Sequence, residues 1–345
     1  MLAHIIIALQ KRGIYAVAIP IQNVEKNEKV TAWRPSFLDR NGSWKAKKVP
    51  SPLIYYNRIM GRKRERTEVT QKAIERIKKN QKIYFNPRYL SKADVHNHLN
   101  KSTLTEYIPT TIIKPTPQEA LDCLSKWTKV YLKPLEGCQG RGIYRIEKWH
   151  HGWKAIGIQQ YGTKNLFFQQ EQKILYWLSK VLKKRDYLCQ QGINLDKWKN
   201  RQYDFRVLVQ KNGQGYWTYV GAGIRLAAPG HVVTHRPNGG QVVKPERVMV
   251  RKLGYKGWKD KKTELAELAE EASKTIEREY KSLFGLITMD VACSEEGKLW
   301  ILEMNSKPGS FDEGPIQRKS YDLLADYVRY LQDQRRNSNE HIHSL

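Results

Sequence analysis

Three oxygen-bearing side chains late in the chain have the types and the spacing of a metal site. Asp290 lies within an apolar stretch, and Glu303 and Asn305 close a second one, with the turn-prone residues Ser-Glu-Glu-Gly at 294–297 between them. This pattern predicts a β-hairpin. Because side chains alternate faces along a strand, Glu303 and Asn305 share a face, and the folded hairpin places Asp290 roughly opposite Glu303. Two carboxylates and an amide oxygen suit Mg²⁺, which keeps waters and phosphate oxygens among its ligands. The alternative is the wet polar face of an ordinary hairpin.

An earlier segment carries groups that bind phosphate. Lys133 ends a short expected strand, the glycines Gly137, Gly140 and Gly142 follow, and a second strand is expected from Ile143. Glycines let backbone N–H groups approach phosphate oxygens because no Cβ intervenes, and the lysine adds positive charge. The order of residues fits neither a Rossmann fingerprint nor a P-loop, since in both the glycines open a helix. Taken alone, the segment is explained equally well by a flexible hairpin turn.

Together, the lysine, the glycine loop and the carboxylate hairpin resemble the ATP-grasp superfamily, which holds ATP between two α+β subdomains. Within it, the chain is similar to the YheC/YheD family of endospore-coat-associated proteins from about residue 14 to residue 330. The motifs that carry this resemblance are Tyr-Tyr-Asn-Arg at 55–58, Tyr-Phe-Asn-Pro at 84–87, Lys133-Pro134, Asp-Phe-Arg-Val at 204–207 and Glu-Met-Asn-Ser-Lys-Pro-Gly at 303–309. The resemblance implies an α+β ATP-grasp fold that uses ATP and Mg²⁺, with two ions expected and Mn²⁺ as an alternative metal.

The resemblance also assigns nucleotide-binding residues one by one. Lys92 matches the lysine that opens the first ATP-grasp helix and reaches the phosphates, and a solvent-facing helix lysine is its alternative. Gln190, Gln191 and Ile193 match the hinge where the adenine edge meets backbone groups. Many family members carry a glutamate where this chain has Gln190 and Gln191, so the acceptor for the adenine amino group stays open.

Three further residues are assigned in the same way. Asp204 resembles the acidic residue near the ribose or hinge, and a structural ion pair with Arg206, on the same strand face, is the alternative. Arg225 matches the arginine near the γ-phosphate and the acyl-phosphate, which a guanidinium can bind through two parallel hydrogen bonds. Lys307 lies just beyond the metal ligands, where related ligases bind substrate or phosphate, and is a candidate for a substrate-facing catalytic role.

The composition is that of a globular protein. The 345 residues are 40% hydrophobic and include ten Trp and nineteen Tyr, which allows two or three domains with a sizeable core. The apolar run at 5–9 is shorter than a signal peptide requires, and no run of about twenty apolar residues could span a membrane. We therefore expect a cytoplasmic protein without a membrane partner. Four scattered cysteines without a C-x-x-C pair indicate neither a disulfide framework nor a zinc site.

The charge is strongly basic. Lys and Arg exceed Asp and Glu by 61 to 34, a formal net charge of +27, and such a field attracts polyanions. Basic clusters interleaved with Trp and Tyr raise the possibility of nucleic-acid binding, but no recognisable nucleic-acid module occurs. We therefore favour an acidic substrate or polymer over specific nucleic acid as the partner of this charge.

The chain divides into four expected regions. These are an N-terminal α/β preface domain at 1–85, a first ATP-grasp subdomain with the glycine loop at 86–185, a second with the Mg²⁺ site at 186–335, and a polar tail at 336–345. Periodicity predicts a strand at 14–19 and helices at 68–79, 92–104, 117–127, 169–184 and 263–284.

These features predict an ATP-dependent carboxylate–amine ligase that acts through an acyl-phosphate. The family resemblance adds spore-coat formation as its setting and spore-coat proteins as partners, and it leaves the carboxylate and the amine unidentified. Two alternatives remain: a scaffold that binds nucleotide or polyanion without turnover, and an ATP-grasp kinase whose product is a phosphate ester.

Overall fold

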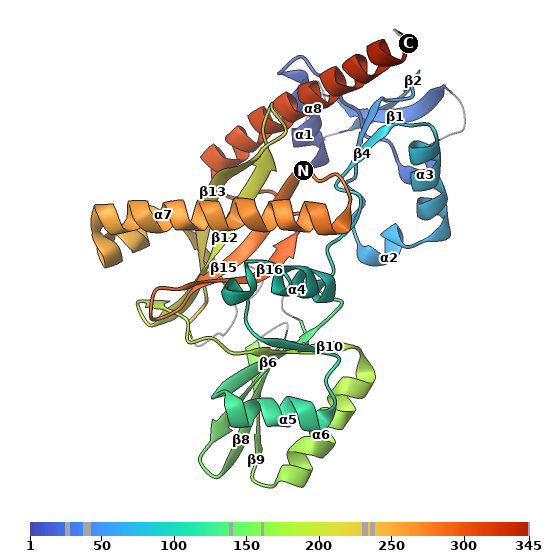
Figure 1. Ribbon diagram of the computed structural model, residues 1–345. Coiled ribbons are helices and arrows are strands. Elements are labelled where there is room, and N and C mark those ends of the chain that lie inside the picture. The colour runs from blue at the N-terminus through green and yellow to red at the C-terminus, as the bar shows by residue number, and fades with distance from the viewer. Residues whose placement is uncertain are drawn as a thin grey trace.

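The structure is a computed structural model that describes residues 1–24, 28–36, 43–137, 141–159, 162–229, 234 and 239–343. Figure 1 shows the first six-stranded sheet and its two helices at the bottom, a second sheet in the middle, and the N-terminal region with the last helix at the top. The chain therefore builds two sheet-based units, with the N-terminal elements attached to the second.

The N-terminal region is made of short elements. They are α1 (Leu2–Gln10), the 3₁₀ turn η1 (Ile21–Asn23), β1 (Lys29–Pro35), β2 (Trp44–Pro50), β3 (Ile54–Tyr56), α2 (Arg62–Glu65), α3 (Glu68–Lys79) and β4 (Ile83–Phe85). β1 pairs with β2 antiparallel and β3 with β4 parallel. The helix predicted at 68–79 is confirmed: Thr67 caps it by accepting from the backbone N–H of Thr70, and Ala73, Ile74 and Ile77 are buried. The strand predicted at 14–19 is wrong, because only Ala18 forms a bridge there, with Trp33.

The first sheet has the strand order β5-β10-β6-β7-β8-β9 and is antiparallel throughout. Its strands are β5 (Thr111–Ile113), β6 (Lys129–Pro134), β7 (Tyr144–Trp149), β8 (Gly152–Gln159), β9 (Gly162–Phe168) and β10 (Tyr187–Gln191). Helices α5 (Pro117–Lys126) and α6 (Glu171–Lys184) pack Leu124 and Leu178 against Val130 and Leu132 of β6. Since strand side chains alternate, the intervening residues of β6, including Lys133, face away from these helices.

The second sheet has the order β14-β13-β12-β15-β16, and β11 pairs with β12 at its side. Its strands are β11 (Lys197–Trp198), β12 (Arg201–Lys211), β13 (Trp217–Leu226), β14 (Gln241–Val243), β15 (Leu286–Cys293) and β16 (Leu299–Asn305). Helices α4 (Lys92–Asn100) and α7 (Pro245–Tyr280) contribute to the main core on one face, and the 3₁₀ turn η2 (Thr105–Tyr107) borders it. Helix α8 (Gly314–His343) contacts β12 and β13, packing Ile316 and Leu323 beside Leu208 and Val220.

Several helices differ in extent from their sequence predictions. The helix predicted at 92–104 ends at Asn100. The helix predicted at 263–284 begins at Pro245 and is interrupted at Gly254, whose φ of 71° and ψ of 176° are not helical. One face of this helix is apolar, since Leu265, Leu268, Ala272 and Ile276 are buried. The region predicted as a polar tail continues α8 as far as His343. None of the helices in the described ranges has both the length and the apolar character that crossing a bilayer requires.

Helix α8 also completes the core of the N-terminal region. Leu324 and Tyr327 of α8 form one hydrophobic cluster with Leu9 of α1 and Phe85 of β4. Arg12 and Asp322 add an ion pair of 2.5 Å between the same two parts of the chain. The first and last elements are therefore held in one packed unit, as Figure 1 shows at its top.

Candidate functional site

The predicted carboxylate hairpin is present. β15 and β16 pair antiparallel with Asp290 opposite Glu303 and Thr288 opposite Asn305, and the register shifts just after Asp290. The amide nitrogen of Asn305 donates a hydrogen bond of 3.2 Å to Oε1 of Glu303. The hairpin therefore brings the three predicted metal ligands onto one face.

Arg225 links the hairpin to the neighbouring strands. Its Nε and Nη2 donate to the two carboxylate oxygens of Asp204 at 2.8 and 2.9 Å, and Nη2 lies 2.7 Å from Oδ2 of Asp290. The hydroxyl of Thr234 also donates to Asp204. The arginine that pairs with Asp204 is thus Arg225 on β13, whereas Arg206 lies 5.0 Å from the ring of Phe311.

The electrostatics of this cluster keep Arg225 charged. Burial would lower the pKa of the guanidinium, but the charges of Asp290 and Asp204 and their hydrogen bonds raise it above its usual value. All three side chains are at least nine-tenths buried. Buried charges are tolerated only when they are paired and hydrogen-bonded, and this arrangement pairs them.

Lys133 approaches from the first sheet. Its Nζ donates to Oε1 of Gln190 at 2.6 Å, and the Gln190 amide donates in turn to the hydroxyl of Thr111 at 3.1 Å. Burial lowers the pKa of Lys133 to about 8, although the charges of Glu303 and Asp290 act in the opposite direction. The lysine therefore lies within electrostatic range of both metal-ligand candidates, across the boundary between the two sheets.

A small cavity of about 30 Å³ lies where these groups meet. Polar lining comes from Lys92, Lys133, Gln190 and Glu303, and apolar lining includes Ile108, Leu188 and Ile301. An apolar wall with a few convergent polar groups is the lining typical of a small-molecule site, but this volume is about that of a single water molecule. The structure thus brings four of the predicted residues to one cavity.

The glycine loop lies at the end of β6. Nζ of Lys92 donates to the carbonyl oxygen of Gly137 at 3.5 Å, so the loop and α4 are adjacent. Gly142 has a φ of +76°, and a Cβ there would lie 2.8 Å from Nη2 of Arg185. The positive φ at this position therefore favours glycine, whereas the flexible end of Arg185 could shift to admit a Cβ. Gly140 falls outside the described residues.

The hinge residues lie at the end of β10 and just beyond it. The backbone N–H of Gln191 donates to the carbonyl of Thr110 at 2.8 Å, and its side-chain oxygen accepts from the Thr110 N–H at 3.4 Å. Ile193 is 9% exposed. Among the hinge predictions, the structure brings the Gln190 side chain to Lys133, whereas Gln191 is bonded to the neighbouring loop.

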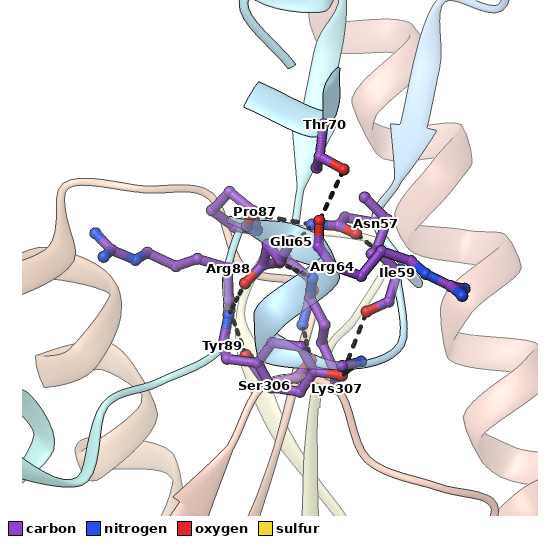
Figure 2. Close-up of polar contacts among 12 residues, drawn as sticks. Asn57, Ile59, Arg64, Glu65, Thr70, Pro87, Arg88, Tyr89, Ser306 and Lys307 are labelled. Atoms are coloured by element: carbon purple, nitrogen blue, oxygen red, sulfur yellow. Dashed lines mark hydrogen bonds and ion pairs between the residues drawn. The ribbon is translucent and has the colours of Figure 1, made fainter. Parts of the chain in front are cut away.

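Lys307 lies in a different environment from the carboxylate cluster. Its side chain is fully buried, forms an ion pair with Glu65 of α2, and has its Nζ 4.8 Å from the centre of the Tyr89 ring. The backbone N–H of Tyr89 donates to Glu65 at 3.0 Å, which completes the network drawn in Figure 2. Burial lowers the pKa of Lys307 to about 8, and its bond to Glu65 partly opposes this. The structure therefore joins Lys307 to the N-terminal region, while its substrate-facing role stays a prediction.

Several partners at the site were not predicted from the sequence. Thr111 and Thr234 are single hydroxyl residues without a motif, and their roles depend on pairing with distant strands. Glu313 lies over β13, where a Cβ on Gly223 would be 1.6 Å from its Oε1, and burial raises the pKa of this carboxyl. The glycine at 223 is the one sequence signal that could have indicated such a close approach.

The oxygen atoms that Asp290, Glu303 and Asn305 offer can be compared with the ligands that Mg²⁺ requires. In the part of the chain that is described, no group of three or more His, Cys, Asp and Glu residues could hold an ion. The candidate set has two carboxylates and one amide, so water and phosphate oxygens would have to fill the remaining positions. That combination fits Mg²⁺, which is usually bound by one or two carboxylates together with substrate phosphates.

Comparison with known proteins identifies the family. A model described as YheC/D-like ATP-grasp matches residues 81–331. The chain belongs to the YheC/D-like ATP-grasp family. This YheC/D-like chain is 28% identical over 283 residues to endospore coat-associated protein YheD of Bacillus subtilis (strain 168), a match that spans 79% of the chain and 60% of YheD. It is 25% identical over 280 residues to YheC of the same organism, covering 78% of the chain and 74% of YheC. The chain thus spans less than two thirds of YheD.

A solved structure confirms the predicted fold class. The ATP-grasp ligase PsnB, complexed with a minimal precursor, superimposes with a TM-score of 0.54 at 13% identity, covering 94% of this chain and 93% of PsnB. At that identity the likeness concerns the fold alone. The YheC/D-like chain therefore has an ATP-grasp α+β fold.

Proposed function

We propose that this chain is an ATP-dependent carboxylate–amine ligase that forms an acyl-phosphate intermediate. The observation that supports it most is the convergence of Lys133, from the first sheet, with Asp290 and Glu303 of the second. Phosphoryl transfer requires a phosphate-binding cation and metal ligands at the same point. Here the cation comes from one unit and the metal ligands come from the other. On this proposal, residues 86–185 and 186–335 act as the two ATP-grasp subdomains, with α4 of the first range packed in the core of the second sheet, and 1–85 as the preface domain.

Asp290, Glu303 and Asn305 would hold the Mg²⁺, as one ion or two. When bound, the metal would neutralise negative charge on the β- and γ-phosphates. Arg225 holds the carboxylate of Asp290 in position and brings a buried positive charge beside the ligands. Asp204 in turn fixes the plane of the guanidinium through two hydrogen bonds. Removing Asp204 would therefore misplace Arg225 and, through it, Asp290.

The nucleotide would be bound by the groups around the small cavity. Lys133 and Lys92 would contact phosphate oxygens, with the backbone of Gly137, Gly140 and Gly142 closing over them. Gln190, Gln191 and Ile193 would border the adenine. Because Gln190 already accepts from Lys133, its amide nitrogen faces Thr111, and adenine recognition would depend on backbone groups of the hinge.

The reaction follows from this arrangement. A substrate carboxylate oxygen attacks the γ-phosphorus, the bond to the β-phosphate oxygen breaks, and ADP leaves. An amine then attacks the acyl carbon, phosphate departs, and the nitrogen loses a proton to give the amide. Arg225 and the lysines stabilise the charge that develops in both steps. The glycine loop protects the acyl-phosphate from water.

The relatives support a setting for this activity. YheC and YheD are both named endospore coat-associated proteins, and PsnB is an ATP-grasp ligase whose structure is complexed with a minimal precursor. We propose a peptide-type ligase that acts on or near a spore-coat component, in the cytoplasm or at the coat. A buried, fully paired cluster of this kind favours catalysis over a scaffold that binds nucleotide without turnover.

Trapping of the intermediate tests the proposal. Purified protein is incubated with Mg-ATP, hydroxylamine and pools of carboxylates, and ADP and hydroxamates are measured. A ligase yields both, because hydroxylamine displaces phosphate from an acyl-phosphate. ADP with a stable phosphate ester and no hydroxamate would identify a kinase. Nucleotide binding without ADP release from any pool would favour the scaffold.

A further inference from the structure

A basic cleft of the described residues lies outside the small cavity. It has a volume of about 510 Å³ and lies between the first sheet and the segment that leads into β12. Lys129, Arg145 and Lys154 line it from β6, β7 and β8, and Lys197 and Arg201 line it from the opposite side. Glu295 is its one lining carboxylate among the described residues. Five cations therefore line the cleft together with Glu295, and Glu147 lies beside them, opposite Lys129 and Lys154 in the sheet.

The strand geometry explains why these cations gather. Ile146 and Ala155 pack in the core beneath α5 and α6, so the alternate positions Arg145 and Lys154 face the other way. Lys129 lies on the same face of β6 as Lys133, four residues away, which is about 13 Å along a strand. The cleft shares no lining residue with the small cavity around Lys133. It is therefore a separate site on the same face of the sheet.

The charges in the cleft are only partly compensated. Arg145 pairs with Glu147 at 3.2 Å, and Lys129 donates to the neutral amide oxygen of Asn194 at 2.8 Å. Lys154 lies over the ring of Trp149 at 4.8 Å. Burial lowers the pKa of Lys129 and the charge of Arg145 lowers it further, whereas the charges of Glu147 and Glu295 act in the opposite direction. An anion entering the cleft would offset the remaining excess of positive charge.

The other lining residues indicate the class of anion. Asn165, Asn194, Asn200 and Gln202 present amide groups, which can pair with peptide N–H and C=O groups. No aromatic side chain occurs among the described lining residues, whereas proteins that bind single-stranded nucleic acid stack bases on aromatic rings. We propose that this cleft binds an acidic peptide segment, with glutamate or aspartate side chains paired to the cations on its two walls.

This inference goes beyond the proposed function, because binding in the cleft does not require ATP or turnover. If the chain is a ligase, an acidic peptide held here would lie beside the nucleotide site on the same sheet face. The cleft would then select substrates or products by charge. Its test is made without nucleotide, so that a failure of ligase activity would leave the result unaffected.

The test measures binding of a fluorescein-labelled hexaglutamate peptide to the full chain by fluorescence anisotropy, with hexaglutamine as the neutral control. We expect hexaglutamate to bind and hexaglutamine not to bind. The affinity for hexaglutamate should fall steeply as salt is raised, because attraction between exposed charges is screened over about 8–10 Å at physiological ionic strength. The double variant Lys154→Glu/Lys197→Glu should lose affinity by about tenfold or more, since like charges would then face the peptide.

The matched control is Lys173→Glu/Lys180→Glu, which makes the same charge change at two exposed positions of α6, on the far side of the same sheet. It should bind hexaglutamate nearly as well as the parent chain. If charge reversal prevents folding, the neutral double variant Lys154→Gln/Lys197→Gln provides a second measurement of the loss of peptide affinity. Mg-ATP affinity should be unchanged in every variant.

Three results would overturn the inference. Equal losses in the cleft and control variants would show that only the overall charge matters. A Mg-ATP affinity that falls together with peptide affinity would make the cleft part of the nucleotide site. An oligothymidylate of equal charge that binds more tightly than hexaglutamate, and is lost in the cleft variant, would assign the cleft to nucleic acid.

Discussion

Glu303 is the metal-ligand candidate whose removal is simplest to interpret. Asp290 is tied to Arg225, so changing it would also release a buried cation, whereas Glu303 bonds to the neutral amide of Asn305. We expect Glu303→Gln to weaken Mg-ATP binding by about tenfold or more, because a charged ligand is lost while the shape is kept. Calorimetry at limiting Mg²⁺ measures the affinity, and circular dichroism checks the fold. Unchanged affinity and turnover would exclude the hairpin as the metal site.

The lowered pKa of Lys133 predicts that ATP affinity depends on pH. Its pKa of about 8 in the free protein lies below the ordinary value of 10.5, so the ammonium is present below pH 8 and is lost above it. Binding of phosphate raises the pKa again, and above pH 8 binding therefore requires uptake of a proton. We expect the affinity for Mg-ATP to fall as the pH rises from 8, by up to about tenfold per unit.

Two variants separate this effect from other titrations. The arginine of Lys133→Arg keeps its charge throughout this pH range. This variant should therefore show no fall in Mg-ATP affinity above pH 8, even if its overall affinity is lower. Lys92→Arg changes an exposed lysine beside the same cavity and should keep the fall. Calorimetric titrations between about pH 7 and pH 9.5 decide the matter. A fall that persists in Lys133→Arg would assign the pH dependence to another group.

Individual site residues were predictable where the signal is local. Asp290, Glu303 and Asn305 lie on two strands joined by a short turn, so alternation and hairpin closure suffice to place them together. The pairing of Asp204 with Arg225 instead requires the register between two long strands, and the sequence alone suggests Arg206 equally well. The partner of Lys307 is 242 residues away, a separation at which no local pattern carries information.

At the scale of elements, Asn86 positions the hairpin. It has a φ of +52°, which asparagine tolerates better than most residues, and it is fully buried. Its Oδ1 accepts from the N–H groups of Gly285 and Leu286, and its Nδ2 donates to the carbonyls of Leu286 and Ser306. One side chain thus bonds the start of β15 and the residue after β16.

We expect Asn86→Asp to lower the free energy of unfolding by about 2–4 kcal/mol, because two carbonyl oxygens would lose their donor and face a carboxylate. Chemical denaturation measures this change. Asn200→Asp is the matched control, since Asn200 also has a positive φ, of +58°, but is exposed. It should change stability by less than about 0.5 kcal/mol. Similar losses in both variants would mean that backbone strain, not the four hydrogen bonds, explains the effect.

Elements with strong caps and periodicity agreed with their predictions. Helix α5 starts with a capping box between Thr116 and Glu119, and its predicted and observed ends differ by one residue. The strand predicted at 14–19 is apolar but has no neighbour to pair with along its length, and apolar runs of this size do not distinguish a strand from packed irregular chain. Helix α7 began earlier than predicted because glycine at 254 accommodates a kink.

At the scale of the whole molecule, the ion pair of Glu65 with Lys307 joins the N-terminal region to the hairpin. Lys307 is fully buried and Glu65 is nearly so, which makes each dependent on the other. We expect Glu65→Gln to destabilise the protein by about 3–5 kcal/mol, because it leaves an uncompensated buried charge. The double variant Glu65→Gln/Lys307→Met should be less destabilised than the single one. Urea denaturation of the four proteins in this cycle gives the coupling energy.

A cycle with additive losses would show that the two side chains do not stabilise each other. It would also remove the reason to treat the N-terminal region and the second sheet as one cooperative unit. Because Lys307 lies two residues beyond Asn305, the same variants report on whether this contact affects the metal hairpin. Mg-ATP affinity that falls in Glu65→Gln and recovers in the double variant would indicate that it does.

The packing of α8 against the N-terminal region has a consequence for biosynthesis. Phe85 and Leu9 leave the ribosome long before Leu324 and Tyr327, the residues that cover them. At typical rates of about 5–20 residues per second, the interval is on the order of ten to fifty seconds. During that time the nascent chain exposes an apolar surface that α8 later covers. We therefore expect the emerging chain to bind chaperones that shield apolar surfaces, which crosslinking of stalled nascent chains would detect.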